Sequence, residues 1–417
     1  MDAAVTVLFL GLLIFVGNIL SRFFTLTKIP DVLFLIAIGI IIGPFLGLVE
    51  PSAFGVIGPL FTMVTLAIIL FEGGLNITIE TLKKAITGTT AITIANFVAI
   101  VGICIGVMHF FAGFTIMESC MLGAILGGTA SAVVIPFTNY LNLRHDTKAI
   151  LALESAIGDV LCIVILLALL NIVELKEFNA GLIVGSLIAS FLIAIIIGVL
   201  AGIWWSSVYH KIASIKSIFL TPAFVFIIFG FVSLLGFSGA IAALALGLTL
   251  GNLHYFKAEK FLPFLGDEIT QVELTPIEKT FFSQLVSLLK TFFFIYIGIS
   301  IHFTNMEVIY LGAVLTVLFY LVRIVIVWFT IPRGIPAPDA AIVSVMDPKG
   351  LAAAVLASMP LEAGIAAGQS IQDITYIVIF FSILVCSIMV FLLERTSFTH
   401  VYRKLFWSFG KETDPTS

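Results

Sequence analysis

Charged residues are scarce in this sequence. Only 11% of its 417 residues are Asp, Glu, Lys or Arg, whereas a soluble globular domain carries roughly 25%. Apolar residues make up 61%, and the mean hydropathy is +1.23. So few charges exclude a water-exposed surface over most of the fold. A basic cluster of the kind that binds nucleic acid is also lacking.

Cysteine motifs and a leader pattern are missing as well. The four cysteines form no CxxC and stand in or beside apolar runs, which predicts no metal or disulfide framework and no cofactor of that kind. They are Cys104, Cys120, Cys162 and Cys386. The N-terminal segment has no positively charged region and no cleavage site, so residues 3–23 are predicted to be a retained span.

Long apolar runs recur along the whole chain. Each is long enough to cross about 30 Å of hydrocarbon as a helix, and the alternation typical of a membrane β-barrel is absent. The predicted fold is therefore all-α and polytopic, with about 13 transmembrane helices. The expected spans are 3–23, 30–49, 55–75, 87–112, 117–140, 147–172, 179–207, 217–236, 238–252, 281–303, 307–330, 338–360 and 371–393.

The distribution of basic residues predicts the orientation. With the N-terminus outside, 16 of the 20 Lys and Arg fall in inner loops or in the tail. Lys176 lies outside, and three cations lie within spans: Lys290, Arg323 and Lys349. We therefore expect a multi-pass protein of the cell membrane with a cytoplasmic C-terminus. Residues 394–417 are predicted to be a short cytoplasmic tail with no soluble regulatory domain.

Thirteen spans divide into two six-helix units of opposite orientation around one linker helix. The predicted transporter domain covers 1–393, with repeat one at 1–175, the linker helix at 176–212 and repeat two at 213–393. The fifth span of each repeat contains Gly or Pro at its middle, which favours a discontinuous helix. Corresponding interruptions in two inverted repeats indicate a substrate site. The residues expected where these helices 5 and 12 cross are Gly128, Ala130, Ser131, Asp347, Pro348 and Gly350.

Ionisable residues inside spans are costly and mark function. Besides the three cations they are Glu72, Glu154, Asp159 and Asp347. Ser155 and Asp159 are four residues apart and share a helix face, whereas Glu154 and Asp159 diverge by about 140°. We therefore assign Asp159 with Ser155 to a cavity. Glu154 is assigned to a neighbouring helix, where Arg323 or Lys349 neutralises it.

A carboxylate that faces water at membrane depth binds either a proton or a cation, because burial disfavours its free charge. Such competition at one group couples the movement of the two ions. Oxygen ligands suit Na⁺, a hard ion. The expected set is Asp159, Ser155, and carbonyls or Thr129 in the interrupted fifth span.

Motifs along nearly the whole chain resemble those of sodium/proton antiporters in the monovalent cation:proton antiporter superfamily, on the NhaP-like branch. The resemblance rests on Glu154-Ser155-x-x-Gly158-Asp159, Leu70–Leu75, Phe292–Gly298, Tyr320–Arg323 and Pro348-Lys349-Gly350. It implies alternating access, a homodimer, and a mobile six-helix core that moves against a dimerisation domain. The substrates would be Na⁺ (or Li⁺) and H⁺, and the role would be pH homeostasis.

The resemblance also implies roles for individual residues. Asp159 would carry the ion and the proton, with Ser155 and Thr129 as ligands of Na⁺ and Glu72 as a further ligand. Glu154 and Arg323 would form a structural ion pair, with Lys349 nearby.

The sequence departs from the family pattern at three positions. Gly158 replaces Asn or Asp, so no second acid stands beside Asp159, and this favours electroneutral 1:1 exchange. Ala130 replaces an acid, and Asp347 could offset the helix ends in its place. Both small residues, Gly158 and Ala130, are expected to make room in the cavity. Lys349 replaces an arginine, which removes a bidentate bridge to Glu154.

Other functions stay open on the sequence alone. A K⁺/H⁺ antiporter of the same fold is the main alternative, followed by a Na⁺-coupled organic-anion symporter. An intramembrane aspartyl protease would use Asp159 and Asp347, but its motif needs Gly where Ala156 stands. A channel is a further alternative. Lys290 either extends to the inner surface or pairs with Asp347 or Asp159.

Overall fold

The computed structural model describes the chain in several stretches, and these stretches form helices and no strand. The described residues are 11–12, 15, 31–49, 57–76, 78–80, 89–175, 180–212, 218–255, 275–301, 305–395 and 405–410. Most of the first predicted span lies outside them, and so does most of the segment 253–280 between the ninth and tenth predicted spans.

The chain folds into two compact units that interleave in sequence. Unit one comprises 1–55, 84–173 and 291–417, and unit two comprises 56–83 and 174–290. Each unit therefore takes residues from both predicted repeats. The division differs from the predicted boundaries because it follows packing, whereas the repeats follow the order of the spans.

Unit one consists of the following helices, among them those of the two interrupted spans. They are α2 (Asp31–Ile40) with a π-helical turn (Ile41–Phe45), α5 (Thr89–Cys104) with a second π-helical turn (Ile105–His109), α6 (Ile116–Leu126), α7 (Ser131–Tyr140), most of α8 (His145–Leu175), the second part of α13 (Pro276–Ser300), α14 (Met306–Thr330), α15 (Ala337–Val345), α16 (Leu351–Leu356), α17 (Met359–Glu362) and α18 (Gly368–Arg395).

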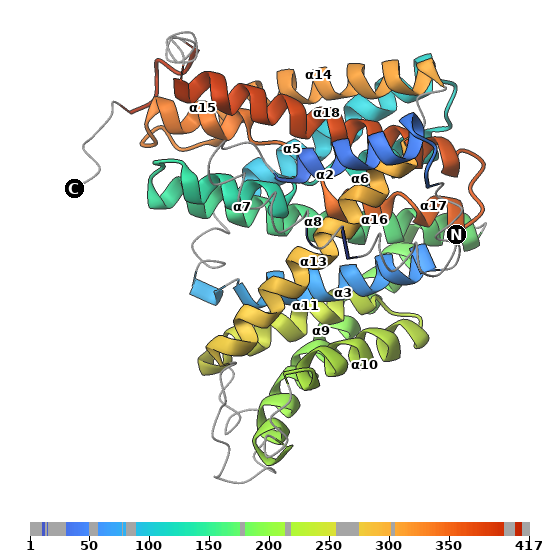
Figure 1. The fold of residues 1–417 in the computed structure, drawn as a ribbon, viewed down its shortest axis with the longest axis vertical. Coiled ribbons are helices and arrows are strands. Elements are labelled where there is room, and N and C mark those ends of the chain that lie inside the picture. The colour runs from blue at the N-terminus through green and yellow to red at the C-terminus, as the bar shows by residue number, and fades with distance from the viewer. Residues whose placement is uncertain are drawn as a thin grey trace. The chain divides into compact units, whose positions relative to one another are not determined.

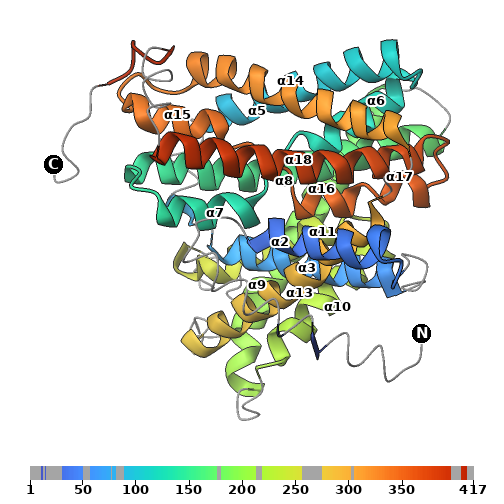
Figure 2. The ribbon, with the colours of Figure 1, turned by 45° about the horizontal axis from the view of Figure 1, so that its top comes forward.

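Within unit one, α14 runs beside α18 and also packs against α5 (Figures 1 and 2). α6 packs against α5, and the short helix α16 lies against both α6 and α18. Five helices among the described residues are long and apolar enough to cross a membrane, and four belong wholly or almost wholly to this unit. They are Thr89–His109, His145–Val173, Met306–Thr330 and Gly368–Glu394, and the fifth is Thr280–Ser300.

Unit two is built around α11. Its elements are α3 (Ile57–Asn76), most of α9 (Ala180–Ile212), α10 (Leu220–Leu234), α11 (Gly239–Gly251), a 3₁₀ turn (Leu253–Tyr255) and the first part of α13. α3, α9 and α10 all pack on α11 (Figure 1).

Small residues explain why α3 and α11 approach so closely. Gly239, Ala243, Gly247 and Gly251 recur every four residues on α11, a spacing that brings membrane helices into backbone contact. A Cβ added to Gly247 would lie 2.1 Å from the Phe71 carbonyl oxygen of α3. The packing leaves no space there for even one methyl group.

We predict that Gly247→Ala strongly destabilises the protein, by about 1–3 kcal/mol, because the added methyl forces two helices apart. Gly230→Ala on α10 is the matched control, since a Cβ there meets nothing within 4 Å. Thermal unfolding in detergent measures both variants. Equal melting temperatures for the two would contradict the packing account.

Candidate functional site

The first interruption separates α6 from α7. Residues 127–130 between them are non-helical. α6 begins with a complete capping box formed by Thr115 and Glu118, whereas Ala130, the residue that precedes α7, makes no side-chain cap. The positive end of α7 is therefore not compensated by its own N-cap side chain.

The second interruption separates α15 from α16. Residues 346–350 are non-helical, and every one of them is buried. The residue before α16 is Gly350, which also offers no side-chain cap. Two unwound segments thus lie within unit one, each followed by a half-helix that starts without a capping side chain.

The two unwound segments contact each other directly. The Ala130 N–H donates to the Pro348 carbonyl over 2.7 Å. A Cβ on Gly350 would come within 2.4 Å of the Ala130 Cβ. Ala130 therefore opens no space, and the expectation that it makes room is wrong, because the backbone of the other segment fills it.

Asp159 lies on α8 beside the start of α7. Its side chain is half-buried, and the Ser131 hydroxyl donates to its Oδ2 over 3.4 Å. This distance exceeds the usual 2.5–3.0 Å for an O–H···O bond, so the contact is weak. Thr129, two residues before Ser131, is buried.

Ser155 lies one turn before Asp159 and is fully buried. Its hydroxyl donates to the Ala152 carbonyl of the same helix over 2.9 Å. The structure thus gives Asp159 a partner from the first interruption, and it gives Ser155 a partner on its own helix. This hydrogen bond uses the hydroxyl hydrogen and leaves the lone pairs of the Ser155 oxygen free. A cation bound at Ser155 would be coordinated through such a lone pair.

Gly158 is covered by the first interruption. A Cβ added to it would lie 3.2 Å from the Gly128 Cα and 3.6 Å from the Thr129 nitrogen. The expectation that Gly158 makes room beside Asp159 is therefore wrong. The missing side chain allows the unwound backbone to approach α8 closely.

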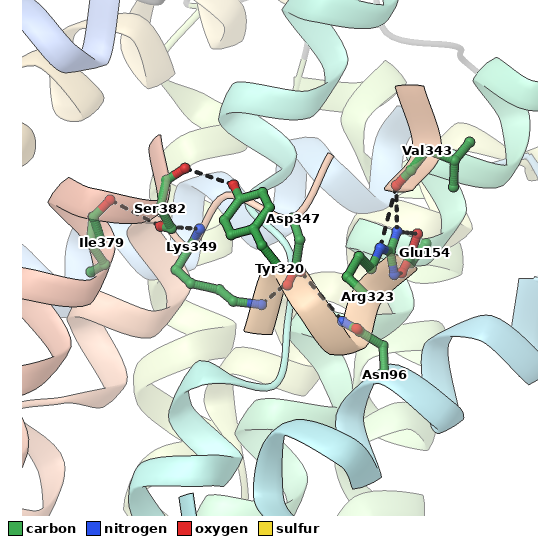
Figure 3. A network of polar contacts seen from close by, with 9 residues as sticks. All are labelled: Asn96, Glu154, Tyr320, Arg323, Val343, Asp347, Lys349, Ile379 and Ser382. Carbon is green, nitrogen blue, oxygen red and sulfur yellow. Dashed lines mark hydrogen bonds and ion pairs between the residues drawn. The ribbon is translucent and has the colours of Figure 1, made fainter. Parts of the chain in front are cut away.

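Glu154, the other acid of α8, has a separate partner. Both Arg323 Nη atoms donate to its two carboxylate oxygens, with 2.7 Å between Nη2 and Oε2 (Figure 3). The Arg323 Nε and Nη2 also donate to the Val343 carbonyl of α15 over 3.3 Å each. This buried bidentate pair joins α8, α14 and α15.

Lys349 does not pair with Glu154. Its amine contacts Asp347 Oδ1 at 2.7 Å, and both side chains are completely buried (Figure 3). Of the two cations considered as partners of Glu154, Arg323 therefore fills that role, and Lys349 pairs with Asp347 instead. The physical reason is that the unwound backbone between the two residues brings the Lys349 amine onto Asp347, and that Glu154 is already bound at both oxygens.

Polar residues of α5, α14 and α18 position the second unwound segment, and the sequence interpretation gave none of them this role. The Asn96 amide of α5 donates to Asp347 Oδ1 over 3.4 Å. The Ser382 hydroxyl of α18 accepts from the Lys349 N–H over 2.9 Å, and the Ser382 carbonyl accepts from the Tyr320 hydroxyl over 2.7 Å. Asn96 could have been found as a buried amide within an apolar run.

Glu72 belongs to α3 of unit two. Lys290 of α13, in the same unit, lies near enough for its positive charge to favour the Glu72 carboxylate. The role of Glu72 as an ion ligand stays a prediction.

In comparisons with known proteins, the family and the relatives that match this chain are described as cation/proton exchangers or antiporters. Residues 10–395 match the family described as sodium/hydrogen exchanger, transmembrane. Na(+)/H(+) antiporter 1 of Methanocaldococcus jannaschii is 25% identical over 336 residues, which cover 76% of this chain and 74% of that protein. K(+)/H(+) antiporter NhaP2 of Shewanella sp. strain MR-4 is 29% identical over 256 residues, which cover 58% of this chain and only 43% of that protein.

The fold is shared with a solved structure, that of the sodium proton antiporter MjNhaP1 from Methanocaldococcus jannaschii at pH 8. The TM-score is 0.73 at 21% identity, and the match covers 93% of this chain and 100% of the other. This likeness establishes the helical architecture. Because the family match spans almost the entire sequence, the chain belongs to the transmembrane sodium/hydrogen exchanger family.

Proposed function

We propose that this chain exchanges Na⁺ or Li⁺ for H⁺ across the membrane, with both ions competing for Asp159. The observation that carries the proposal is the position of this carboxylate. Among the acids of α8 whose side chains the structure describes, Asp146 and Glu154 have a cation partner and Asp159 has none, and Asp159 lies against the oxygen-bearing start of α7. Family membership and the antiporter relatives support the same reaction.

The spacing of the oxygens suits an ion of this size. Na⁺ has nearly the radius of Ca²⁺, whose oxygen ligands lie about 2.4 Å away. Two oxygens 3.4 Å apart, as in Ser131 and Asp159, then subtend roughly 90° at the ion, an angle common in six-coordinate sites. Thr129 and Ser155 are proposed to complete the set, with carbonyls of the unwound segment.

Competition supplies the coupling. A single carboxylate holds either the proton or the cation, and each neutralises the charge that would otherwise oppose burial. The carrier changes its accessible side only when Asp159 is neutral. One ion then returns for each ion that leaves, which is electroneutral 1:1 exchange, because Gly158 provides no second acid.

The fixed charges around this carboxylate are balanced. In our proposal the two interruptions are the crossing helices of two inverted repeats, and the half-helix starts contribute partial positive charge there. Asp347 opposes that charge from the second segment, where Ala130 offers no acid in the first. Lys349 offsets the charge of Asp347, so that the second segment is close to neutral overall. The net charge of the site then depends on whether Asp159 is free or has bound a proton or a cation.

The larger architecture follows the same scheme. We assign the ion-carrying core to unit one and the dimer-forming scaffold to unit two, in a homodimer of the cell membrane. The N-terminus is placed outside and the C-terminus in the cytoplasm, as the basic residues indicate. No part of this scheme requires a resident cofactor.

A K⁺/H⁺ antiporter is the second candidate, because relatives named K(+)/H(+) antiporter NhaP2 share 29% identity. A Na⁺-coupled organic-anion symporter has weaker support, since it would need a larger polar cavity. Exchange assays with Na⁺, Li⁺ and K⁺ side by side separate these functions.

We predict that Asp159→Asn abolishes exchange, because a neutral amide takes up no proton near neutral pH and so cannot exchange a proton for a cation. Cation-induced dequenching of a pH-gradient dye in proteoliposomes measures the rate. Asp146→Asn is the control, since that exposed carboxylate at the start of α8 lies outside the site. Full exchange by correctly folded Asp159→Asn would remove the proposal.

Electroneutral exchange predicts that membrane voltage does not alter the rate. Proteoliposomes are clamped with valinomycin at potentials of either sign, and Na⁺-driven proton movement is recorded at each. The rates are expected to agree within error. A rate that changes systematically with voltage would show that net charge moves in each cycle and would contradict 1:1 exchange.

The Glu154–Arg323 pair predicts a large stability effect. Arg323→Met leaves a buried carboxylate uncompensated and costs about 3–5 kcal/mol. The double variant Glu154→Met/Arg323→Met removes both charges and should recover much of the loss. Thermal unfolding of the three proteins tests this, and a double variant less stable than the single one would contradict it.

A further inference from the structure

Gly158 and Gly128 form a contact between α8 and the unwound segment of the first interruption. A Cβ on Gly128 would lie 3.0 Å from the Cys162 Sγ and 3.2 Å from the Gly158 carbonyl carbon. From the opposite side, a Cβ on Gly158 would lie 3.2 Å from the Gly128 Cα. Gly128 is therefore seated on α8 between positions 158 and 162, one helical turn apart.

We infer that Gly158 is a positioning residue that sets the cation size accepted at Asp159. The inference rests on the proposed function and names a determinant of its selectivity. Gly158 itself offers no ligand. It acts by fixing how closely Thr129 and Ser131 approach the carboxylate.

The contact between Gly158 and Gly128 is linked to the ion site through the residues that follow each glycine. Gly158 directly precedes Asp159, so the glycine and the carboxylate share one turn of α8. Gly128 directly precedes Thr129 and stands three residues before Ser131, whose hydroxyl reaches Asp159 Oδ2 at 3.4 Å. Any group inserted between Gly158 and Gly128 moves those oxygens away from the carboxylate.

The segment cannot move freely in compensation, because its other side is also held. Ala130 contacts Gly350 and donates to the Pro348 carbonyl over 2.7 Å. Gly127 is packed on the Phe97 ring, which would lie 2.4 Å from an added Cβ. Three contacts thus fix the unwound segment: with α8, with the second unwound segment, and with the Phe97 ring. The size of residue 158 determines the contact with α8.

A wider site favours a larger ion. Ligands that cannot close around a small cation leave part of its lost hydration uncompensated, whereas a larger cation reaches both sides of the gap. Gly158 therefore biases the site toward Li⁺ and Na⁺ over K⁺. The glycine that removes the second acid of the family motif thereby also tightens the cation site.

The test is Gly158→Ala in proteoliposomes, with initial exchange rates measured against Li⁺, Na⁺ and K⁺ concentration. A methyl at 3.2 Å from Gly128 Cα displaces the segment by a few tenths of an ångström. We expect the ratio of the Li⁺ KM to the Na⁺ KM to rise by about threefold or more. The maximal rate should fall much less than this ratio changes.

Gly102→Ala on α5 is the matched control, because a Cβ there meets nothing within 4 Å, and its KM ratio should not change. If Gly158→Ala does not fold, Gly128→Ala with Cys162→Ala pushes the same contact from the other side and should shift the ratio in the same direction.

Unchanged cation ratios in active variants would overturn the inference and leave the exchange function standing. A general loss of rate with no change in KM ratio would also overturn it, because that is the signature of a purely structural role. Absence of exchange in the native protein would instead overturn the proposed function.

Discussion

The contact between the two unwound segments is the constraint on which the site depends. One hydrogen bond, from the Ala130 N–H to the Pro348 carbonyl, joins them directly. Extended backbone inside a membrane protein leaves N–H and C=O groups that lipid cannot satisfy. Burying the two segments against each other satisfies some of those groups, and it requires small side chains at Ala130 and Gly350. The site is therefore assembled from backbone as much as from side chains.

This arrangement explains how so few charges are distributed. Glu154 with Arg323 and Asp347 with Lys349 form two buried neutral pairs. The first pair links α8 to α14 and the second lies within the unwound segment 346–350, and breaking either one would strand a charge at high cost. Asp159 has no cation as partner in the described contacts, which is what an ion-carrying group requires. A cation fixed beside it would remove the need for a transported ion.

The sequence predicted the features that depend on composition and local spacing. Scarcity of charge indicated membrane helices, glycine and proline at mid-span indicated the interruptions near 127–131 and 346–350, and helical spacing separated Glu154 from Asp159. It could not predict contacts that depend on unwound chain. Lys349 and Asp347 are two residues apart, which would place them on different faces of a helix, but the unwound backbone brings their side chains together. Gly158 likewise suggested empty space, because nothing local indicates that Gly128 fills it.

The central claim is that one carboxylate holds either a proton or a cation. The most direct measurement is proton release from purified protein in weakly buffered detergent solution when Na⁺ is added, followed with a pH indicator. Competition predicts a saturable release that diminishes as the starting pH rises and that is missing in Asp159→Asn. Saturable Na⁺ binding without proton release, or release that persists in the variant, would contradict the account.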